Sequence, residues 1–126
     1  MIRWLEKRRF VSFIFLFLIA IEIFYFSSRP GTAFGTGGIS FIPALYHFIV
    51  FFLFGFFMIL TIKGTNKIKP KYVMISVIVS VLYAISDEIH QLFVPLRSCS
   101  FGDLMTDSMG IFLGILIYLF SLRKEL

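Results

Sequence analysis

Four polar side chains within five consecutive residues are the part of this sequence best equipped for chemistry. They are Asp87, Glu88, His90 and Gln91, and they lie in the otherwise apolar stretch 72–94. Two carboxylates, an imidazole and an amide can move protons, ligate a cation or hold a polar ligand. Packing alone rarely needs so many polar groups in a stretch this apolar, so we expect a functional site here.

Further candidates for the same site stand elsewhere along the chain: Glu22, His47, Arg97, Asp103 and Asp107. Three of them also have simpler interpretations, which remain open at this point. Asp103 follows Ser100 by three residues and fits the acid of a helix capping box. Glu22 can reach a membrane interface or pair with Arg29. A lone histidine such as His47 is usually an ordinary buried side chain.

The elements that must position these residues are four apolar stretches, 10–26, 41–62, 72–94 and 104–122. Apolar residues make up 59% of the 126 residues and charged residues only 15%, which is too few to cover a water-soluble domain. At about 1.5 Å per residue, each stretch can cross a hydrocarbon layer of about 30 Å, the first only just. The sequence therefore predicts an all-α fold, an integral membrane four-helix bundle, with residues 1–126 as a single domain.

Local signals mark the ends of these helices. Ser40 can cap the second helix with Pro43 in its first turn, Pro70 opens the third, and Pro95 closes it. Ser100 and Asp103 predict a capping box for the fourth helix.

The distribution of basic residues predicts the orientation in the membrane. The net charge is +5, and ten of the twelve Lys and Arg residues lie before the first stretch, between the second and third, or after the fourth. The other two, Arg29 and Arg97, occupy the remaining connections. By the positive-inside rule, both termini are then cytoplasmic and the polar candidates lie in the outer half of a cell membrane. Because orientation accounts for the basic charge, we expect no nucleic acid partner.

Helical periodicity groups the polar residues into two stripes. The third stretch carries Ser76, Ser80, Tyr83, Asp87, His90 and Gln91 on one face, with Glu88 beside them. The fourth carries Asp103, Asp107, Gly110, Gly114 and Ser121 on one face. Gly110 and Gly114 form a GxxxG pair, which lets another helix approach closely. We expect the two stripes to face each other.

The net charge of the predicted site limits the kinds of ligand that it can hold. Five carboxylates face two arginines, which leaves three excess negative charges when both histidines are neutral. Such an excess calls for protonation, a bound cation or a cationic ligand. Asp87, His90 and Asp107 are the candidate ligands for a divalent cation, which could bridge the carboxylates to a lipid pyrophosphate contacted by Arg97.

Two classes of function are compatible with these residues. In the first, the chain binds a membrane lipid, a cell-wall precursor or a glycopeptide at the outer leaflet. In the second, it is an intramembrane hydrolase or transferase, with or without a metal, that acts on a lipid headgroup or cell-wall precursor. His90 would then be the general base, and Asp87 its orienting partner or a metal ligand. The single cysteine, Cys99, excludes an internal disulfide and a cysteine-based zinc site.

The polar run resembles a known family pattern. Residues 86–98 read SDEIHQLFVPLRS and are followed by Asp103, Asp107 and Gly110. This arrangement resembles the VanZ-like family, whose pattern is S-D-E-x-H-Q-x-F-x-P-G-R and then D-x-x-x-D/N-x-x-G. The motif FSSRPG at residues 26–31 and the pair His47-Phe48 are similar to the same family.

The resemblance adds expectations that the residues alone do not give. It implies a small multi-pass membrane protein of a bacterial cell, of the Gram-positive kind, and it favours the binding class of function and an effect on teicoplanin sensitivity. One position departs from the pattern, because Leu96 stands where glycine is usual. Glycine there would permit a positive-φ turn, so we expect the loop that places Arg97 to differ.

Overall fold

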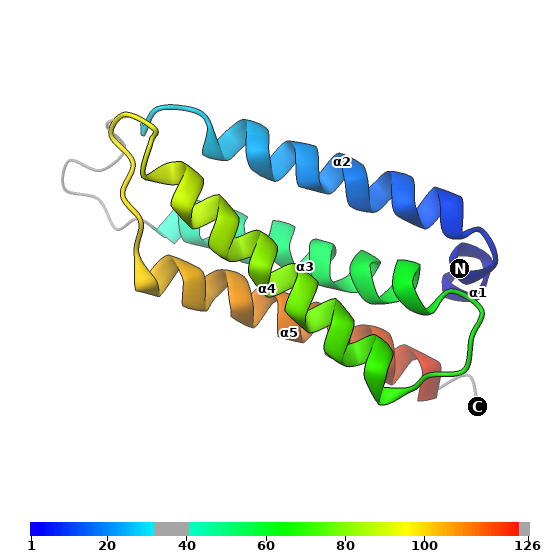
Figure 1. Cartoon of the computed structure of the whole chain (residues 1–126). Helices are drawn as coiled ribbons and strands as arrows, with labels where there is room; N and C mark the ends of the chain where they lie inside the picture. Colours follow the sequence, from blue (N-terminus) through cyan, green and yellow to red (C-terminus); the bar gives the residue numbers. More distant parts are fainter. Residues whose placement is uncertain (32–40, 124–126) are drawn as a thin grey trace.

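Every element in the described part of the chain is a helix (Figure 1). The computed structural model describes residues 1–31 and 41–123, without the side chains of residues 41 and 42. Its helices are α1 (Ile2–Lys7), α2 (Arg9–Ser27), α3 (Phe41–Lys63), α4 (Pro70–Gln91) and α5 (Phe101–Arg123). The four longer helices are apolar and long enough to cross a membrane, which confirms the predicted fold class.

The helix ends follow the local signals with small shifts. Pro70 opens α4 as predicted, but α4 ends at Gln91 and not at Val94. Residues 92–94 continue as tighter turns, in which Val94 N donates to Gln91 O at 3.1 Å, before Pro95. The stretch predicted as the first membrane helix, 10–26, forms α2, which begins at Arg9. The short helix α1 before it was not predicted. The predicted cap Ser40 lies outside the described residues.

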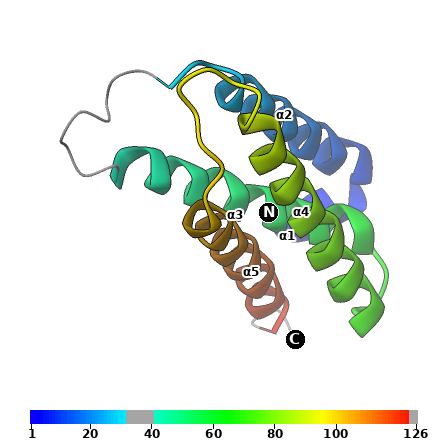
Figure 2. The same ribbon diagram turned by 60° about the vertical axis from the view of Figure 1, so that its left-hand side comes forward.

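The helix α3 is central and contacts each of the other four helices. The four long helices pack into one bundle, in which α3 crosses α4 and α5 at an angle (Figures 1 and 2). The N-terminus, the short helix α1 and the last described turn of α5 lie at one end of the bundle (Figure 1). We call this the basic end, and we call the opposite end, where α2 and α4 finish and α3 and α5 begin, the acidic end.

The closest helix pair is α3 with α5, and glycines make this approach possible. A Cβ on Gly110 would lie 2.5 Å from the Phe48 carbonyl oxygen, and a Cβ on Gly55 would lie 2.6 Å from the Ile111 carbonyl oxygen. A Cβ on Gly114 would overlap the Phe52 carbonyl oxygen. The GxxxG pair thus contacts α3, whereas its stripe was expected to face α4. A face with no side chains fits a backbone better than it fits the large polar residues of α4.

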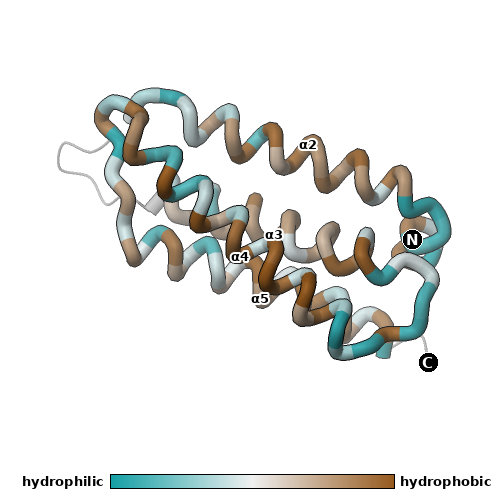
Figure 3. Tube along the Cα trace, in the orientation of Figure 1, coloured by the Kyte–Doolittle hydropathy of each residue, from teal (hydrophilic) through white to brown (hydrophobic). Residues whose placement is uncertain are grey.

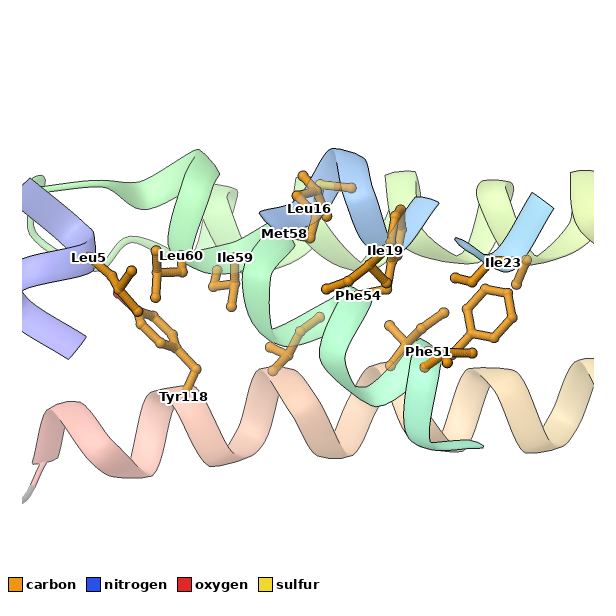
Figure 4. Close-up of a cluster of buried hydrophobic side chains, with 14 residues drawn as sticks. Leu5, Leu16, Ile19, Ile23, Phe51, Phe54, Met58, Ile59, Leu60 and Tyr118 are labelled. Carbon is orange, nitrogen blue, oxygen red and sulfur yellow. The ribbon is translucent and has the colours of Figure 1, made fainter. Parts of the chain in front are cut away.

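The interior of the bundle is apolar along most of its length. Phe51, Phe54, Ile59 and Ile111 pack between the helices, and Tyr118 reaches from α5 toward Leu5 of α1 (Figure 4). The hydrophilic residues gather toward the two ends of the bundle, and the helices between them are largely hydrophobic (Figure 3). Many large apolar side chains remain exposed along the outer faces, which a lipid environment would cover.

A buried ion pair holds the basic end together and was not anticipated. Lys63 Nζ donates to Glu6 Oε1 at 2.9 Å, and the Tyr118 hydroxyl donates to the same oxygen. Glu6 and Lys63 are only 8% and 5% exposed. These contacts fasten α1 to the ends of α3 and α5.

Candidate functional site

The acidic end gathers its polar side chains into separate groups and not into one recess. Two of these groups lie on different sides of the final turns of α4, because successive helical residues point about 100° apart. One group faces α3 and α5, and the other faces α2.

His47, Glu88 and Asp107 form the first group, which we call the carboxylate–imidazole cluster. They come from α3, α4 and α5, and one ligand-capable atom of each lies within 4.8 Å of the others. Asp107 is fully buried and Glu88 is 2% exposed. His47 Nδ1 lies 3.3 Å from Asp107 Oδ1.

Several polar atoms of this cluster lack a hydrogen-bond partner among the described residues. They are His47 Nδ1, Glu88 Oε1 and both carboxylate oxygens of Asp107. The approach between His47 and Asp107 therefore has ion-pair distance without hydrogen-bond geometry. Buried carboxylate oxygens without donors are costly, so the cluster is arranged for something other than mutual hydrogen bonding.

The second oxygen of Glu88 has a partner that alters the predicted capping box. Ser100 Oγ accepts from the backbone N–H of Gly102 and of Asp103, at 3.1 and 3.4 Å, as an N-cap should. The backbone N–H of Ser100, however, donates to Glu88 Oε2 at 3.2 Å. The acid that completes this cap thus comes from α4, and Glu88 links α4 to the start of α5.

Asp87 belongs to the second group, which faces α2. Its Oδ2 accepts from Ser27 Oγ at 2.8 Å and from Gln91 Nε2 at 3.0 Å. All three residues are buried. Ser27 was not among the predicted site residues, although it lies inside the FSSRPG motif that carries part of the family resemblance.

His90 also faces α2 but is paired with Ser28 and not with Asp87. His90 Nε2 lies 2.9 Å from Ser28 Oγ, and the imidazole stacks on Phe24 with ring centroids 4.7 Å apart. Ser28 Oγ donates its own proton to the Phe24 carbonyl at 2.6 Å. The imidazole therefore donates to Ser28, so the serine is not activated as a nucleophile in this arrangement.

Arg97 fastens the loop after α4 to the end of α2. Its guanidinium donates to the Phe26 carbonyl at 3.0 Å and to the Arg29 carbonyl at 3.2 Å. Leu96, just before it, has φ of 59°, in the left-handed region. Leucine thus adopts the positive-φ turn that glycine would permit, at a cost of about 1–2 kcal/mol.

The remaining candidates lie at the edges of these groups. Glu22 is exposed, and Tyr46 Oη donates to it at 3.4 Å. Arg29 lies over the Tyr25 ring, 5.5 Å from its centroid, and not against Glu22. Asp103 is half-buried in the first turn of α5.

The set of possible metal ligands differs from the predicted set. Asp87 and His90 face α2, so the residues that come together as potential ligands are His47, Glu88 and Asp107. Only Asp107 belongs to both sets. The sequence placed His47 in the same half of the bundle but gave no sign that α3 would bring it to Asp107.

An apolar groove runs between α2 and α4 with α3 as its floor. Its volume is about 440 Å³, and its walls include Leu16, Ala20, Phe54, Leu82 and Ser86. Along α4, the residues Leu82, Ser86 and His90 follow one another at intervals of four and share one face. The last wall residue of the groove on α4, Ser86, therefore lies one turn before His90 on the same face.

Fold and site together define an all-helical membrane protein with buried polar groups at one end of a four-helix bundle. The VanZ/LLP1 family model matches residues 10–122, and the chain belongs to this family. A search of the curated proteins and a search of the solved structures each gave no match.

Proposed function

We propose that this chain is a binding protein of the outer membrane leaflet that holds an amphiphilic cell-envelope lipid between α2 and α4. The observation that carries this proposal is the apolar groove, whose last wall residue on α4, Ser86, lies one helical turn before His90. A hydrocarbon chain fits the groove walls around Leu82 and Phe54, and a polar headgroup then lies beside His90 and Ser28.

The charges near this end of the groove favour an anionic headgroup such as a phosphate. His90 and Arg97 both contact the last turns of α2, and Arg29 follows directly. The carboxylates of Glu88 and Asp107 lie on the other side of α4, toward α3 and α5. On the side that faces α2, Arg29 and Arg97 balance Glu22 and Asp87, so this side carries no excess of negative charge. Arginine and histidine are suitable donors to phosphate oxygens.

Binding is favoured over hydrolysis by the hydrogen bonds of His90. The Ser28 proton is directed to the Phe24 carbonyl, and Asp87 is held by Ser27 and Gln91. A general base assisted by Asp87 would need a contact between Asp87 and His90, which are instead engaged with other partners.

The lipid proposal is tested with a photoactivatable phosphatidylglycerol in vesicles that contain the purified protein. We expect crosslinked peptides to come mainly from α2 and α4 along the groove. Ser86→Phe fills the groove and should reduce crosslinking about five-fold or more, while Leu116→Phe, on the exposed face of α5, should not. Crosslinks spread equally over all exposed faces would contradict a lipid site in the groove.

The family resemblance adds a cell-wall precursor or a glycopeptide to the amphiphiles that this site could bind. If a glycopeptide is bound, deletion and overexpression should change the inhibitory concentration of teicoplanin in opposite directions. Unchanged values in both strains would count against this choice of ligand and leave the crosslinking result to stand alone.

The proposal places the acidic end outside the cell and both termini in the cytoplasm, and Cys99 tests this orientation. Its side chain is exposed in the connection between α4 and α5. Partial desolvation and then the nearby Glu88 carboxylate raise the pKa of the Cys99 thiol. If the acidic end is outside, a membrane-impermeant maleimide should label Cys99 on intact cells. Because the pKa of the thiol is raised, the labelling rate should keep rising at pH values above the pKa of an ordinary cysteine.

A matched control uses the opposite end of the bundle. In a Cys99→Ser background, Thr65→Cys places the thiol in the exposed connection between α3 and α4. This variant should be labelled only after the membrane is permeabilised. The reverse pattern of labelling would invert the orientation.

A further inference from the structure

We propose that the carboxylate–imidazole cluster of His47, Glu88 and Asp107 binds one divalent transition-metal ion. This inference goes beyond the lipid-binding proposal, because the cluster faces α3 and α5, whereas the groove and His90 face α2. A metal site here could exist without a lipid site, and the reverse is equally true.

Charge balance is the first argument for a cation. With a neutral imidazole, the two carboxylates carry two negative charges at a buried position where α3, α4 and α5 meet at the acidic end. Isolated charges in such surroundings are expensive, and they are normally paired or bound to metal. One divalent ion makes the cluster neutral.

The unpartnered atoms are the second and independent argument. Asp107 is fully buried, yet neither of its oxygens has a hydrogen-bond partner among the described residues. Glu88 Oε1 and His47 Nδ1 share this condition. All three residues thus bring unpartnered polar atoms into one small buried volume.

The distance between His47 and Asp107 suits a metal with short bonds, and the Glu88 ligand atom lies within 4.8 Å of both. Zinc bonds to imidazole nitrogen and carboxylate oxygen are about 2.0–2.2 Å, so neighbouring ligands lie about 3–3.5 Å apart. His47 Nδ1 and Asp107 Oδ1 are 3.3 Å apart, and no pair of ligand atoms exceeds 4.8 Å. The imidazole nitrogen favours Zn²⁺ over Ca²⁺ and Mg²⁺, which prefer oxygen, while the two carboxylates also suit Mn²⁺.

The cluster lies beside the connection between α4 and α5, at the acidic end of the bundle. This position gives an ion a path from solvent to the cluster. The Cys99 thiol is exposed and interacts with Glu88. Asp103 lies one turn of α5 before Asp107 and is half-buried. An incoming cation would meet these groups before it reached Asp107.

The test is metal binding by the purified full-length protein in detergent, after treatment with a chelator and return of Zn²⁺ or Mn²⁺ alone. We expect close to one ion per chain by elemental analysis. Glu88→Gln and Asp107→Asn should each weaken the affinity ten-fold or more, while Glu22→Gln, an exposed acid outside the cluster, should leave it unchanged. The melting temperature of the unmodified protein should rise with metal and that of Asp107→Asn should not.

Both variants should still fold, because each amide keeps the shape of the acid that it replaces and removes a buried charge. A loss of metal binding would then not be due to misfolding. Metal content no higher than in a detergent blank would overturn the proposal. So would an affinity that survives both Glu88→Gln and Asp107→Asn. If protons alone neutralise the cluster, the melting temperature will be insensitive to metal and chelator, which also overturns it. None of these outcomes depends on the lipid crosslinking.

Discussion

Gly114→Ala is expected to destabilise the protein by about 3 kcal/mol or more, although it adds a single methyl group. A Cβ at this position would overlap the Phe52 carbonyl oxygen and lie 3.0 Å from the Phe56 backbone nitrogen. Both obstacles are backbone atoms of α3, which cannot rotate aside as a side chain can. The helices α3 and α5 must therefore separate, and the packing of Ile111 and Ile115 between them is lost. The yield of monodisperse protein and the thermal melting temperature in detergent measure this effect.

Gly102→Ala is the matched control for this experiment. Gly102 is exposed in the first turn of the same helix, and a Cβ there would approach only the Ser100 hydroxyl, at 3.3 Å. Because alanine is a better helix former than glycine, this variant should melt at the same temperature as the unmodified protein or slightly above it. A Gly114→Ala protein that melts with the control would show that α3 and α5 are not in backbone contact.

Lys63→Met is expected to have the second large effect, about 3–5 kcal/mol of lost stability. Lys63 is only 5% exposed, and its ammonium group is the cation that pairs with the buried Glu6 carboxylate. Methionine has a similar length but no charge, so Glu6 keeps its charge in a buried position with the Tyr118 hydroxyl as its remaining partner. Thermal melting in detergent and resistance of α1 to proteolysis report the loss.

Adding Glu6→Gln to Lys63→Met should restore most of the stability. The amide oxygen still accepts from Tyr118, and no charge is left unpaired. Lys69→Met removes an exposed lysine at the same end and should change stability by less than about 0.5 kcal/mol. A double variant that is no better than Lys63→Met would mean that the charge of Glu6 is not the cause of the instability.

The four long helices could be predicted because their signals are local. Each is an apolar run of sufficient length, and residues such as Pro70 interrupt the helical hydrogen bonds wherever the chain folds. The errors are also local: α4 stops at Gln91, three residues before the predicted end, and α1 was too short and too polar to be recognised as a helix. The burial of Glu6 could not be inferred, because its partners lie 57 and 112 residues away.

Helical periodicity in the sequence could not predict which residues of other helices the polar side chains contact. It correctly showed that Asp87 and Gln91 share a face, and they are hydrogen-bonded. Periodicity also placed Asp87 and Glu88 in one group, although Asp87 contacts α2 and Glu88 faces α3 and α5. The GxxxG pair was recognised as a close-approach surface, but its partner is α3 and not α4.

By itself, the sequence determined the four long helices, their approximate bounds, and which end of the bundle carries most of the acids and both histidines. These properties follow from hydrophobicity and backbone chemistry within a few turns of the chain. Only the tertiary structure decided that His47 meets Glu88 and Asp107, and that His90 meets Ser28. The physical reason is that a helical repeat fixes the direction of a side chain relative to its own axis, whereas its neighbour is fixed by how the helices pack around α3.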